Sequence, residues 1–600
     1  MKHCGTQELE TERLVLRRLS IDDSEMMFNN WASDSQVTQY LRWNAHRSWG
    51  ETAETLNEWE KHYDDPAFYQ WGITDKHTGV LFGTISLFPA PALKMGWHLN
   101  TERLGPAWEV GYALGRKWWN KGYATEALCT VRDYWFDTVG ADWLAAVEAA
   151  VAQLRVQVPA AWAQVRGIGL SGHMHGAVVL GAQGQVLRPA ILWNDGRASA
   201  ECALLEQAVP TSRQITGNLA MPGFTAPKLL WLRTHEPDVF AQIRTVLLPK
   251  DWLRLQLTGD VVSDMSDASG TLWLDVQARA WSPAMLQACG LDASHMPALA
   301  EGSAPTGTLR SDVARRWGLR EGVVVAAGAG DNAASAVGVG ARTAGQGFVS
   351  LGTSGVVFRV TDAFAPATER AVHAFAHALP ARWHHMSVML SAASAFGWVT
   401  RLTGRGDEAQ LSAAVGALPA SRQAQAPLFL PYLSGERTPH NNAAATGVFM
   451  GLRAEHDAAD LAYAVMEGVG FGLLDGLNAM RAAGSTPAVQ AEPVEARPRS
   501  TTEIHSSPLA LVGGGARSNP WAQLLASALG TPLQRPEGAH AAAALGAARL
   551  AAMACGGDEA HWSQPLAADA TFQPEPAQQA LLAERYARFV ALYPALQAQF

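Results

Sequence analysis

An aspartate at the start of an Ala-rich segment, and a small-residue turn shortly after it, form the stretch of this sequence best suited to phosphoryl transfer. Asp331 follows an apolar, Gly-rich run, and the turn Ser350–Gly355 ends a strand-like stretch. Phosphoryl transfer needs a carboxylate that accepts a hydroxyl proton and a backbone cradle that binds phosphate. Gly352 and Thr353 can supply that cradle, because small residues let backbone N–H groups close on an anion. A tight hairpin that binds nothing is the alternative interpretation of one such turn.

A second polar turn carries residue types that bind sugars. Trp193, Asn194, Asp195 and Arg197 follow a short apolar stretch. An indole packs against the C–H face of a sugar, while carboxylate and amide groups bind its hydroxyls. The structural alternative is a salt-bridged surface turn.

A third turn has the features of a nucleotide site. The apolar run from Leu509 ends in the triple-glycine turn Gly513–Gly515, and a helix is expected to start near Asn519. Glycines allow a nucleotide to approach the backbone closely, although one strand–glycine–helix turn is a weak signal. The Ala-rich run 541–552 is expected to form a helix nearby.

Bulk composition limits the classes of protein. A chain of 600 residues is too long for one core, so two to four domains are expected. The net charge of -9 and the lack of a long basic run argue against nucleic-acid partners. Five scattered cysteines without a CxxC pair suit a reducing compartment and argue against structural zinc. No signal peptide or membrane-spanning run is recognised, so we expect a cytoplasmic protein without membrane partners.

Tryptophan usage divides the chain into two unlike parts. Eleven of the 22 tryptophans lie between Trp31 and Trp143, which places the join near Gly140–Asp142. The first part is expected to contain one alternating strand over residues 9–17, strands at 82–87 and 108–113, and a basic turn over 115–122 that opens a helix. These features resemble the ribosomal-protein-alanine type of GNAT N-acetyltransferase, in which this turn holds the coenzyme A pyrophosphate. Residues 1–141 are therefore expected to form a GNAT-like domain, but a partial one, because the strands that complete the acyl-CoA cleft are not recognised.

From residue 142 onward the sequence resembles the FGGY family of carbohydrate kinases. The turns described above carry the resemblance, together with Gly167–Gly176, Met221–His235 and the polar loop Pro431–Asn442. The resemblance implies two actin/RNase H-like α/β domains around a cleft, at residues 142–340 and 341–600. It also implies ATP-dependent phosphorylation of D-xylulose, with Mg²⁺ neutralising charge on the transferred group.

The resemblance assigns roles to particular residues. Asp331 is the expected catalytic base for the C5 hydroxyl. The expected sugar-binding residues are Met174, His175, Trp193, Asp195 and Asn332. The expected nucleotide-binding residues are Gly352, Thr353, Gly515, Ala516 and Asn519. No metal ligand is assigned.

The chain departs from the family pattern in two places. The family begins with an Asp-x-Gly-Thr phosphate loop, and no such loop precedes Asp142. Losing one phosphate clamp and its strands should lower activity strongly, because preorganised charge stabilisation is a large catalytic term. A Pro- and charge-rich insert at 489–508 is expected to be a disordered surface loop, which a fold tolerates at small entropic cost.

Three functions stay open at the level of sequence. The leading one is the sugar kinase. The others are a CoA-dependent N-acetyltransferase and an inactive sugar- or nucleotide-binding remnant of a gene fusion. A homodimer is a candidate assembly that the sequence does not fix.

Overall fold

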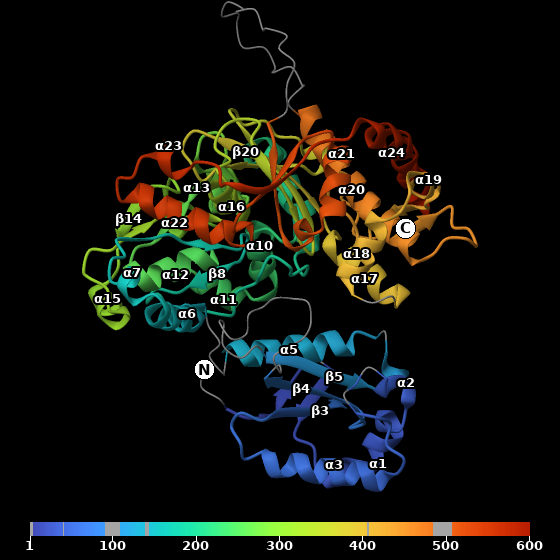
Figure 1. The fold of residues 1–600 in the computed structure, drawn as a ribbon. Helices are drawn as coiled ribbons and strands as arrows, with labels where there is room; N and C mark the ends of the chain where they lie inside the picture. Colours follow the sequence, from blue (N-terminus) through green and yellow to red (C-terminus); the bar gives the residue numbers. More distant parts are fainter. Residues whose placement is uncertain are drawn as a thin grey trace, which may run out of the picture. The chain divides into compact units, whose positions relative to one another are not determined.

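The computed structural model describes residues 4–89, 108–137, 143–404, 407–483 and 507–600, apart from positions 12, 40, 42 and 120. It separates into two compact units, Met1–Gln164 and Val165–Phe600 (Figure 1). The expected join near Gly140–Asp142 lies outside the described residues, and so does the expected insert at 489–508 apart from its last two positions. No helix in the described ranges is both long and apolar enough to cross a bilayer.

The first unit is a mixed α/β structure. Its elements are β1 (Leu9–Glu10), β2 (Leu14–Arg17), α1 (Ser24–Met27), α2 (Ser35–Thr38), α3 (Trp49–His62), β3 (Tyr69–Asp75), β4 (Leu81–Pro89), β5 (Trp108–Leu114), α5 (Tyr123–Asp137), α6 (Trp143–Gln157) and α7 (Pro159–Trp162).

The five strands of the first unit form an antiparallel sheet in the order β1-β2-β3-β4-β5. Helix α5 covers one face of this sheet and helices α1 and α3 cover the other (Figure 1). Period-two alternation in β3 buries Trp71 and Ile73 against α5. Within the described part of this unit, helices and not further strands follow α5.

The expectation of one strand over residues 9–17 is wrong, because the chain makes a hairpin there. Leu9 pairs with Leu16 in antiparallel register. Thr11 closes the turn: its backbone N–H donates to the Leu14 carbonyl at 2.9 Å, and its Oγ1 accepts from the Leu14 N–H at 2.8 Å. A threonine side chain that bonds to a nearby backbone group favours a turn over a continuous strand.

The second unit begins with many short elements. They are β6 (Gly167–Ile168), β7 (Ser171–Gly172), β8 (Val178–Leu180), α8 (Ser199–Ala208), α9 (Ser212–Thr216), α10 (Thr225–His235), α11 (Pro237–Gln242), β9 (Thr245–Leu247), α12 (Pro249–Thr258), β10 (Val262–Asp264), α13 (Met265–Ser269), β11 (Leu274–Asp275), β12 (Ala280–Trp281), α14 (Pro283–Ala288), β13 (Ala298–Ala300), β14 (Pro305–Thr308), α15 (Ser311–Trp317), β15 (Val324–Ala326), β16 (Ala329–Gly330) and α16 (Asp331–Val339).

Longer elements complete the second unit. They are β17 (Gly347–Leu351), β18 (Gly355–Thr361), β19 (His373–Ala376), β20 (Trp383–Met389), α17 (Ala393–Thr403), α18 (Glu408–Gly416), α19 (Ala420–Gln425), β21 (Leu428–Leu430), β22 (Val448–Met450), α20 (Ala458–Ala483), β23 (Leu509–Val512), α21 (Asn519–Leu529), β24 (Leu533–Pro536), α22 (Ala542–Ala554), α23 (Glu559–Trp562), β25 (Ala568–Phe572) and α24 (Pro576–Leu596).

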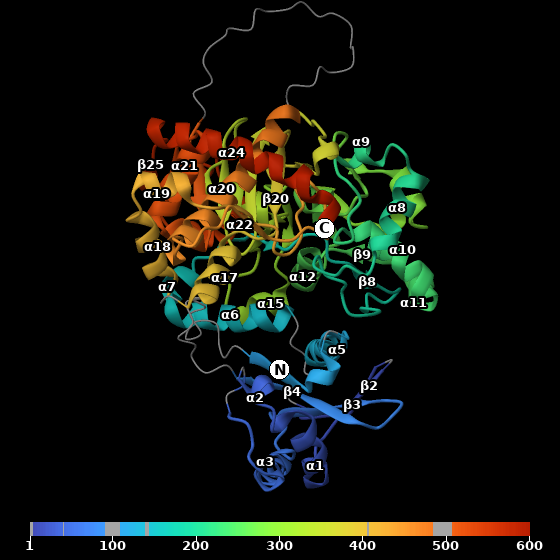
Figure 2. The same ribbon diagram turned by 90° about the vertical axis from the view of Figure 1, so that its right-hand side faces the viewer.

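A seven-stranded sheet organises the C-terminal half of this unit, in the order β19-β20-β18-β17-β23-β24-β25. Its strands β17, β23 and β24 are parallel. Helices α20, α21 and α24 gather beside it and share one hydrophobic cluster (Figure 2). The N-terminal half has smaller sheets, in which β6 pairs in parallel with β15 and β7 with β16.

Helices α16 and α22 cross at very short range, and small residues permit the crossing. A Cβ built on Gly338 would lie 1.9 Å from the Ala542 carbonyl oxygen, and one built on Gly546 would lie 1.8 Å from the Ala334 carbonyl oxygen. Both backbones must therefore lack side chains at the crossing. This contact fixes α16, the helix that starts at Asp331.

We predict that Gly338→Ala destabilises the second unit by about 1–3 kcal/mol, because the added methyl forces the two helices apart. Alanine for glycine inside a helix otherwise stabilises by roughly 0.5–1 kcal/mol. Urea unfolding of the variant measures the change. Gly470→Ala in α20 is the matched control, since its Cβ would meet no atom closer than 3.4 Å. Equal midpoints for the two variants would contradict the close crossing.

Candidate active site

The proposed base Asp331 stands at the junction of strand β16 and helix α16. Its Oδ1 accepts hydrogen bonds from the Asn332 backbone N–H at 2.7 Å and from Asn332 Nδ2 at 3.0 Å. Burial raises the pKa of Asp331 above its usual value, and the bonds from Asn332 oppose this in part. The preceding Gly330 N–H donates to Ser266 Oγ at 3.2 Å, which anchors the junction to α13. A carboxylate of raised pKa is a stronger proton acceptor.

Met174 and His175 lie beside this junction. Because β7 pairs in parallel with β16, Gly172 being opposite Gly330, the turn after β7 emerges next to the start of α16. Met174 packs directly on Gly330, where an added Cβ would lie 2.9 Å from Met174 Cγ. The structure therefore brings Met174 against the residue that precedes the proposed base, and His175 follows it in the same turn.

The His175 ring is held in one orientation. Its Nδ1 lies 2.8 Å from the Gly270 carbonyl oxygen, so the neutral ring donates there and its Nε2 carries the lone pair. The backbone of His175 is left-handed, with φ of 75°. Burial lowers the pKa of His175 to about 3, so the ring is neutral at physiological pH.

The buried Lys228 joins the His175 segment to Gly223. The Lys228 Nζ donates to the His175 carbonyl at 2.9 Å and to the Gly223 carbonyl at 2.7 Å. Burial lowers the pKa of Lys228 to about 7, although Asp195 acts to raise it. Burial tends to raise the pKa of Asp195, but hydrogen bonds from Arg197 outweigh this and lower it.

Trp193 is 53% exposed, so its side chain is accessible to a ligand. Helix α10 contributes to this region through Lys228, which joins the backbone at His175 to the backbone at Gly223.

The candidate phosphate turn Ser350–Gly355 and the candidate nucleotide turn Gly513–Gly515 lie side by side. Strands β17 and β23 are parallel neighbours, with Ser350 opposite Val512, so the turns at their C-terminal ends meet. A Cβ on Gly513 would lie 2.7 Å from the Leu351 carbonyl oxygen, and one on Gly515 would lie 2.6 Å from Leu351 Cδ2. Ligands commonly bind at the carboxyl ends of parallel strands.

The first turn is braced against helix α17. The Ala393 N–H donates to the Gly352 carbonyl at 2.8 Å, and Ser394 Oγ donates to the Thr353 carbonyl at 2.7 Å. With these carbonyls engaged, Thr353 remains exposed at the tip. The turn is thus preformed.

Ala516 and Asn519 have partners of their own. Arg535 Nη1 donates to the Ala516 carbonyl and to Asn519 Oδ1, both at 3.0 Å. Ala516 is buried and Asn519 is exposed. Asn519 is therefore the more accessible of the two to a nucleotide.

A fully buried charged cluster lies near the junction of β16 and α16. Lys250 Nζ lies 2.5 Å from Asp251 Oδ1, 3.0 Å from Asp264 Oδ1 and 3.6 Å from Asp267 Oδ2. Asp264 Oδ2 also caps α13 by accepting from the backbone N–H groups of Ser266 and Asp267.

The electrostatics of this cluster are strongly perturbed. Burial raises the pKa of Asp267 well above its usual value, and Lys250 opposes this. Burial alone would lower the pKa of Lys250, but the three carboxylates raise it. The charge of Asp331 also acts on Asp267, which links the cluster to the proposed base.

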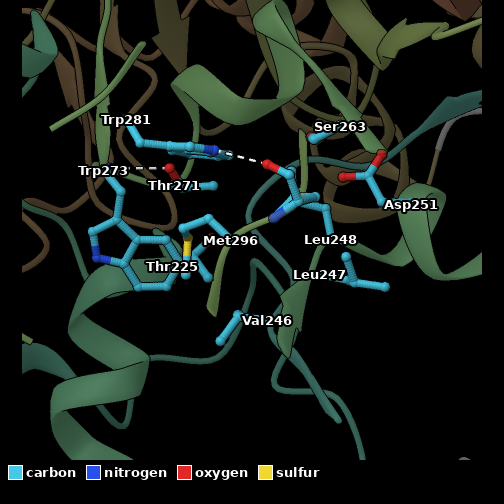
Figure 3. A pocket seen from close by; sticks show the side chains of 11 residues that line it. Thr225, Val246, Leu247, Leu248, Asp251, Ser263, Thr271, Trp273, Trp281 and Met296 are labelled. Carbon is cyan, nitrogen blue, oxygen red and sulfur yellow. Dashed lines mark hydrogen bonds between the residues drawn. The ribbon is translucent and has the colours of Figure 1, made fainter. Parts of the chain in front are cut away.

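A cavity of about 10 Å³ lies beside this cluster, lined by Asp251, Ser263, Trp273 and Trp281 among others (Figure 3). Asp251 Oδ2 and Ser263 Oγ are buried without a hydrogen-bond partner in the described part of the chain. The cavity has room for about one water molecule, which could satisfy both atoms, and is far too small for a sugar.

Buried neutral histidines should make the second unit sensitive to acid. Burial lowers the pKa of His377 to about 3, while an unfolded histidine titrates near 6.5. The unfolded chain therefore binds the proton first as pH falls, and stability present above about pH 6.5 is lost below it. Burial of Glu436, which raises its pKa to about 8, acts in the opposite direction on total stability.

The test therefore compares the free energy of unfolding of the wild type with that of a variant that lacks His377. We predict that the stability advantage of the wild type over His377→Gln shrinks by about 1.4 kcal/mol between roughly pH 7.5 and pH 5.5. Urea unfolding at both pH values measures it, and Glu436 cancels because both proteins contain it. A constant difference would contradict a neutral buried His377.

The first unit contains a separate large cavity. It measures about 760 Å³ and is lined by β4, β5 and the turn leading into α5. Its lining includes Gly111, Tyr112, Trp118, Gly122 and Tyr123. This volume is in the range of small-molecule sites.

Among the described residues, no group of three or more His, Cys, Asp or Glu side chains is arranged to hold a metal ion.

Three models of known protein families match parts of the chain. Residues 123–338 match the N-terminal domain of the FGGY family of carbohydrate kinases, and residues 347–555 match its C-terminal domain. Residues 13–153 match the acetyltransferase (GNAT) domain, which overlaps the first of these matches.

Individual relatives are similar over most of the chain. The xylulose kinase of Escherichia coli (strain K12) is 52% identical over 432 residues, 72% of this chain and 84% of that protein. The xylulose kinase of Klebsiella pneumoniae is 52% identical over 65% of this chain and 76% of that protein. The crystal structure of a xyloylose kinase from Brucella ovis superposes with a TM-score of 0.69 at 47% identity, covering 76% of this chain and 90% of that one.

Proposed function

The chain belongs to the FGGY family of carbohydrate kinases, and on that premise we propose that it transfers the terminal phosphoryl group of ATP to D-xylulose. The product would be D-xylulose 5-phosphate. The observation that carries this proposal is the half-buried carboxylate of Asp331 beside the Met174–His175 turn.

In the proposed mechanism Asp331 accepts the proton of the attacking sugar hydroxyl. Asn332 holds one carboxylate oxygen and orients the group. The Nδ1–H of His175 donates to the Gly270 carbonyl, so its Nε2 would accept a hydrogen bond from a sugar hydroxyl. Trp193 offers its exposed face to the sugar C–H groups, and Asp195 would bind a further hydroxyl.

The nucleotide would lie across the two neighbouring turns. Gly352 and Thr353 would bind its phosphates, while Gly515, Ala516 and Asn519 would border the adenosine. The fit is supported by the adjacent strand ends and by the open space next to Gly514. Mg²⁺ would neutralise phosphate charge, and since such ions are commonly held by one or two carboxylates together with the phosphates, no protein cage is needed.

We also propose that the kinase part divides into two domains near Gly340. Helix α16 ends at Val339 and strand β17 starts at Gly347, which leaves a short connection there.

The test is ADP release by the full-length chain with ATP, Mg²⁺ and a panel of ketoses. D-xylulose is expected to give the highest kcat/KM. Turnover would mean that the chain works without an Asp-x-Gly-Thr loop before Asp142. Saturable D-xylulose binding without turnover would instead support the inactive-remnant alternative, and failure to bind any ketose would contradict the proposal.

A second candidate function concerns the first unit alone, whose cavity of about 760 Å³ borders the Gly122 turn. Helix α5 starts at Tyr123 directly after this turn, and a helix N-terminus favours a pyrophosphate. We propose that this cavity binds acetyl-CoA. Protection of residues 108–128 from proteolysis by acetyl-CoA would support it, and unchanged cleavage at saturating acetyl-CoA would contradict it.

A further inference from the structure

The polar loop Pro431–Asn442 presents an arginine that none of the roles above uses. Arg437 is half-buried, and within the described residues its guanidinium makes no hydrogen bond or ion pair. A half-buried guanidinium that has no counter-ion in the protein keeps its N–H donors available for an anion.

The loop around Arg437 is rigidly held. The Thr438 Oγ1 donates to the Ala371 carbonyl at 2.9 Å and accepts from the Val388 N–H at 3.1 Å. Glu436 Oε1 accepts from the Leu390 N–H at 3.2 Å. These bonds fasten both neighbours of Arg437 to the region of β20, so the guanidinium is placed before any ligand binds.

The adjacent acid does not neutralise Arg437. Burial raises the pKa of Glu436 to about 8, so this carboxyl is largely protonated at neutral pH. No ion pair joins the two side chains among the described contacts, and Glu436 Oε2 is buried without a hydrogen-bond partner. Arg437 therefore leaves a net positive charge at this place.

Contacts between rings connect this loop to the site described above. Thr438, next to Arg437, is bonded to Ala371, two positions before His373. The ring centroids of His373 and Phe224 lie 5.7 Å apart, and those of Phe224 and His175 lie 4.4 Å apart. The charge of Arg437 adds to the lowering of the pKa of His175 and His373, for which burial is the main cause. The buried Lys228 is the other cation facing His175.

The same loop also approaches the first phosphate turn. Leu390, which is bonded to Glu436, follows Met389, and Met389 pairs with Gly355 at the end of that turn. Arg437 is thus linked by short connections to both the proposed sugar residues and the proposed phosphate residues.

We propose that Arg437 binds the phosphoryl group that is transferred to the sugar, and that it holds this group on the phosphorylated product. A guanidinium suits this task because its fork of N–H donors matches phosphate oxygens in bidentate fashion. The inference rests on the proposed kinase function and adds a residue that binds the anion and not the sugar hydroxyls.

The experiment is calorimetric titration of D-xylulose and of D-xylulose 5-phosphate into the full-length wild type, Arg437→Met and Arg437→Lys. Arg437→Met is expected to weaken binding of the phosphate ester at least about tenfold and to leave D-xylulose binding within about twofold. Arg437→Lys is expected to recover part of the loss, because it keeps the charge without the fork. Arg359→Met, a half-buried arginine on β18 that donates to the Gly345 carbonyl, is the matched control and should change neither affinity.

The outcomes separate this inference from the kinase function. Equal weakening of both ligands in Arg437→Met, or no change in either, would overturn the phosphate role. A wild type that binds D-xylulose but not its phosphate ester would also overturn it and leave the kinase proposal standing. A wild type that binds neither would contradict both. Thermal unfolding of each variant shows that the comparison concerns folded protein.

Discussion

Replacement of Asp331 by alanine should reduce kcat for D-xylulose phosphorylation by roughly 10²–10⁴-fold, the usual contribution of a positioned general base. The rate should fall because no other described carboxylate is placed at the start of α16 to accept the proton. The sugar KM should change little, because Trp193, Asp195 and His175 remain in place. Sugar-dependent ADP release measures the rate, and calorimetric D-xylulose binding separates chemistry from affinity.

The pH dependence provides a second readout for Asp331. Its pKa is raised by burial, so kcat/KM of the wild type should fall as pH drops through that raised value, where the base becomes protonated. Asp312→Ala, which removes an exposed acid on α15, is the control and should keep the wild-type profile. Retention of full activity by Asp331→Ala would remove the central residue from the proposed mechanism.

The local elements around the site could be predicted from the sequence because each has a strong local signal. The run before Asp331, the Ala-rich segment after it and the turn Ser350–Gly355 appear as β16, α16 and the β17–β18 turn. The triple-glycine turn likewise lies between β23 and α21. In these places glycine and apolar periodicity indicate the element type locally, although the pairing of the strands still depends on distant segments.

What could not be predicted depends on contacts between distant segments. Gly338 and Gly546 are 208 positions apart, and nothing local reveals that their backbones touch. The alternation over residues 9–17 fits one strand as well as a hairpin. In the structure the Thr11 side chain bonds to the Leu14 N–H and stabilises the turn of the hairpin. The role of Lys228 requires the His175 carbonyl, 53 positions away.

The charged cluster around Lys250 is the clearest example of an arrangement that the sequence does not reveal. Short acids near serines suggest helix caps, and Asp264 is one. The sequence does not show that Lys250 is placed among three carboxylates, with its side chain only 1% exposed. A charge this deep is tolerated only when it is paired, and removal of one partner leaves the others without compensation.

We therefore expect Lys250→Met to lower the free energy of unfolding of the second unit by about 3–5 kcal/mol, the usual cost of breaking a buried ion pair. Methionine fills most of the lysine volume, so the loss of unfolding free energy comes mainly from removal of the charge and not from poorer packing. Urea unfolding followed by tryptophan fluorescence measures it. The double variant Lys250→Met/Asp267→Asn should recover part of the loss, because it removes one uncompensated carboxyl group, while Lys61→Met, at an exposed lysine, should have little effect. A loss below about 1 kcal/mol would mean that the buried acids are already protonated and that Lys250 is not the group that holds the cluster beneath Asp331.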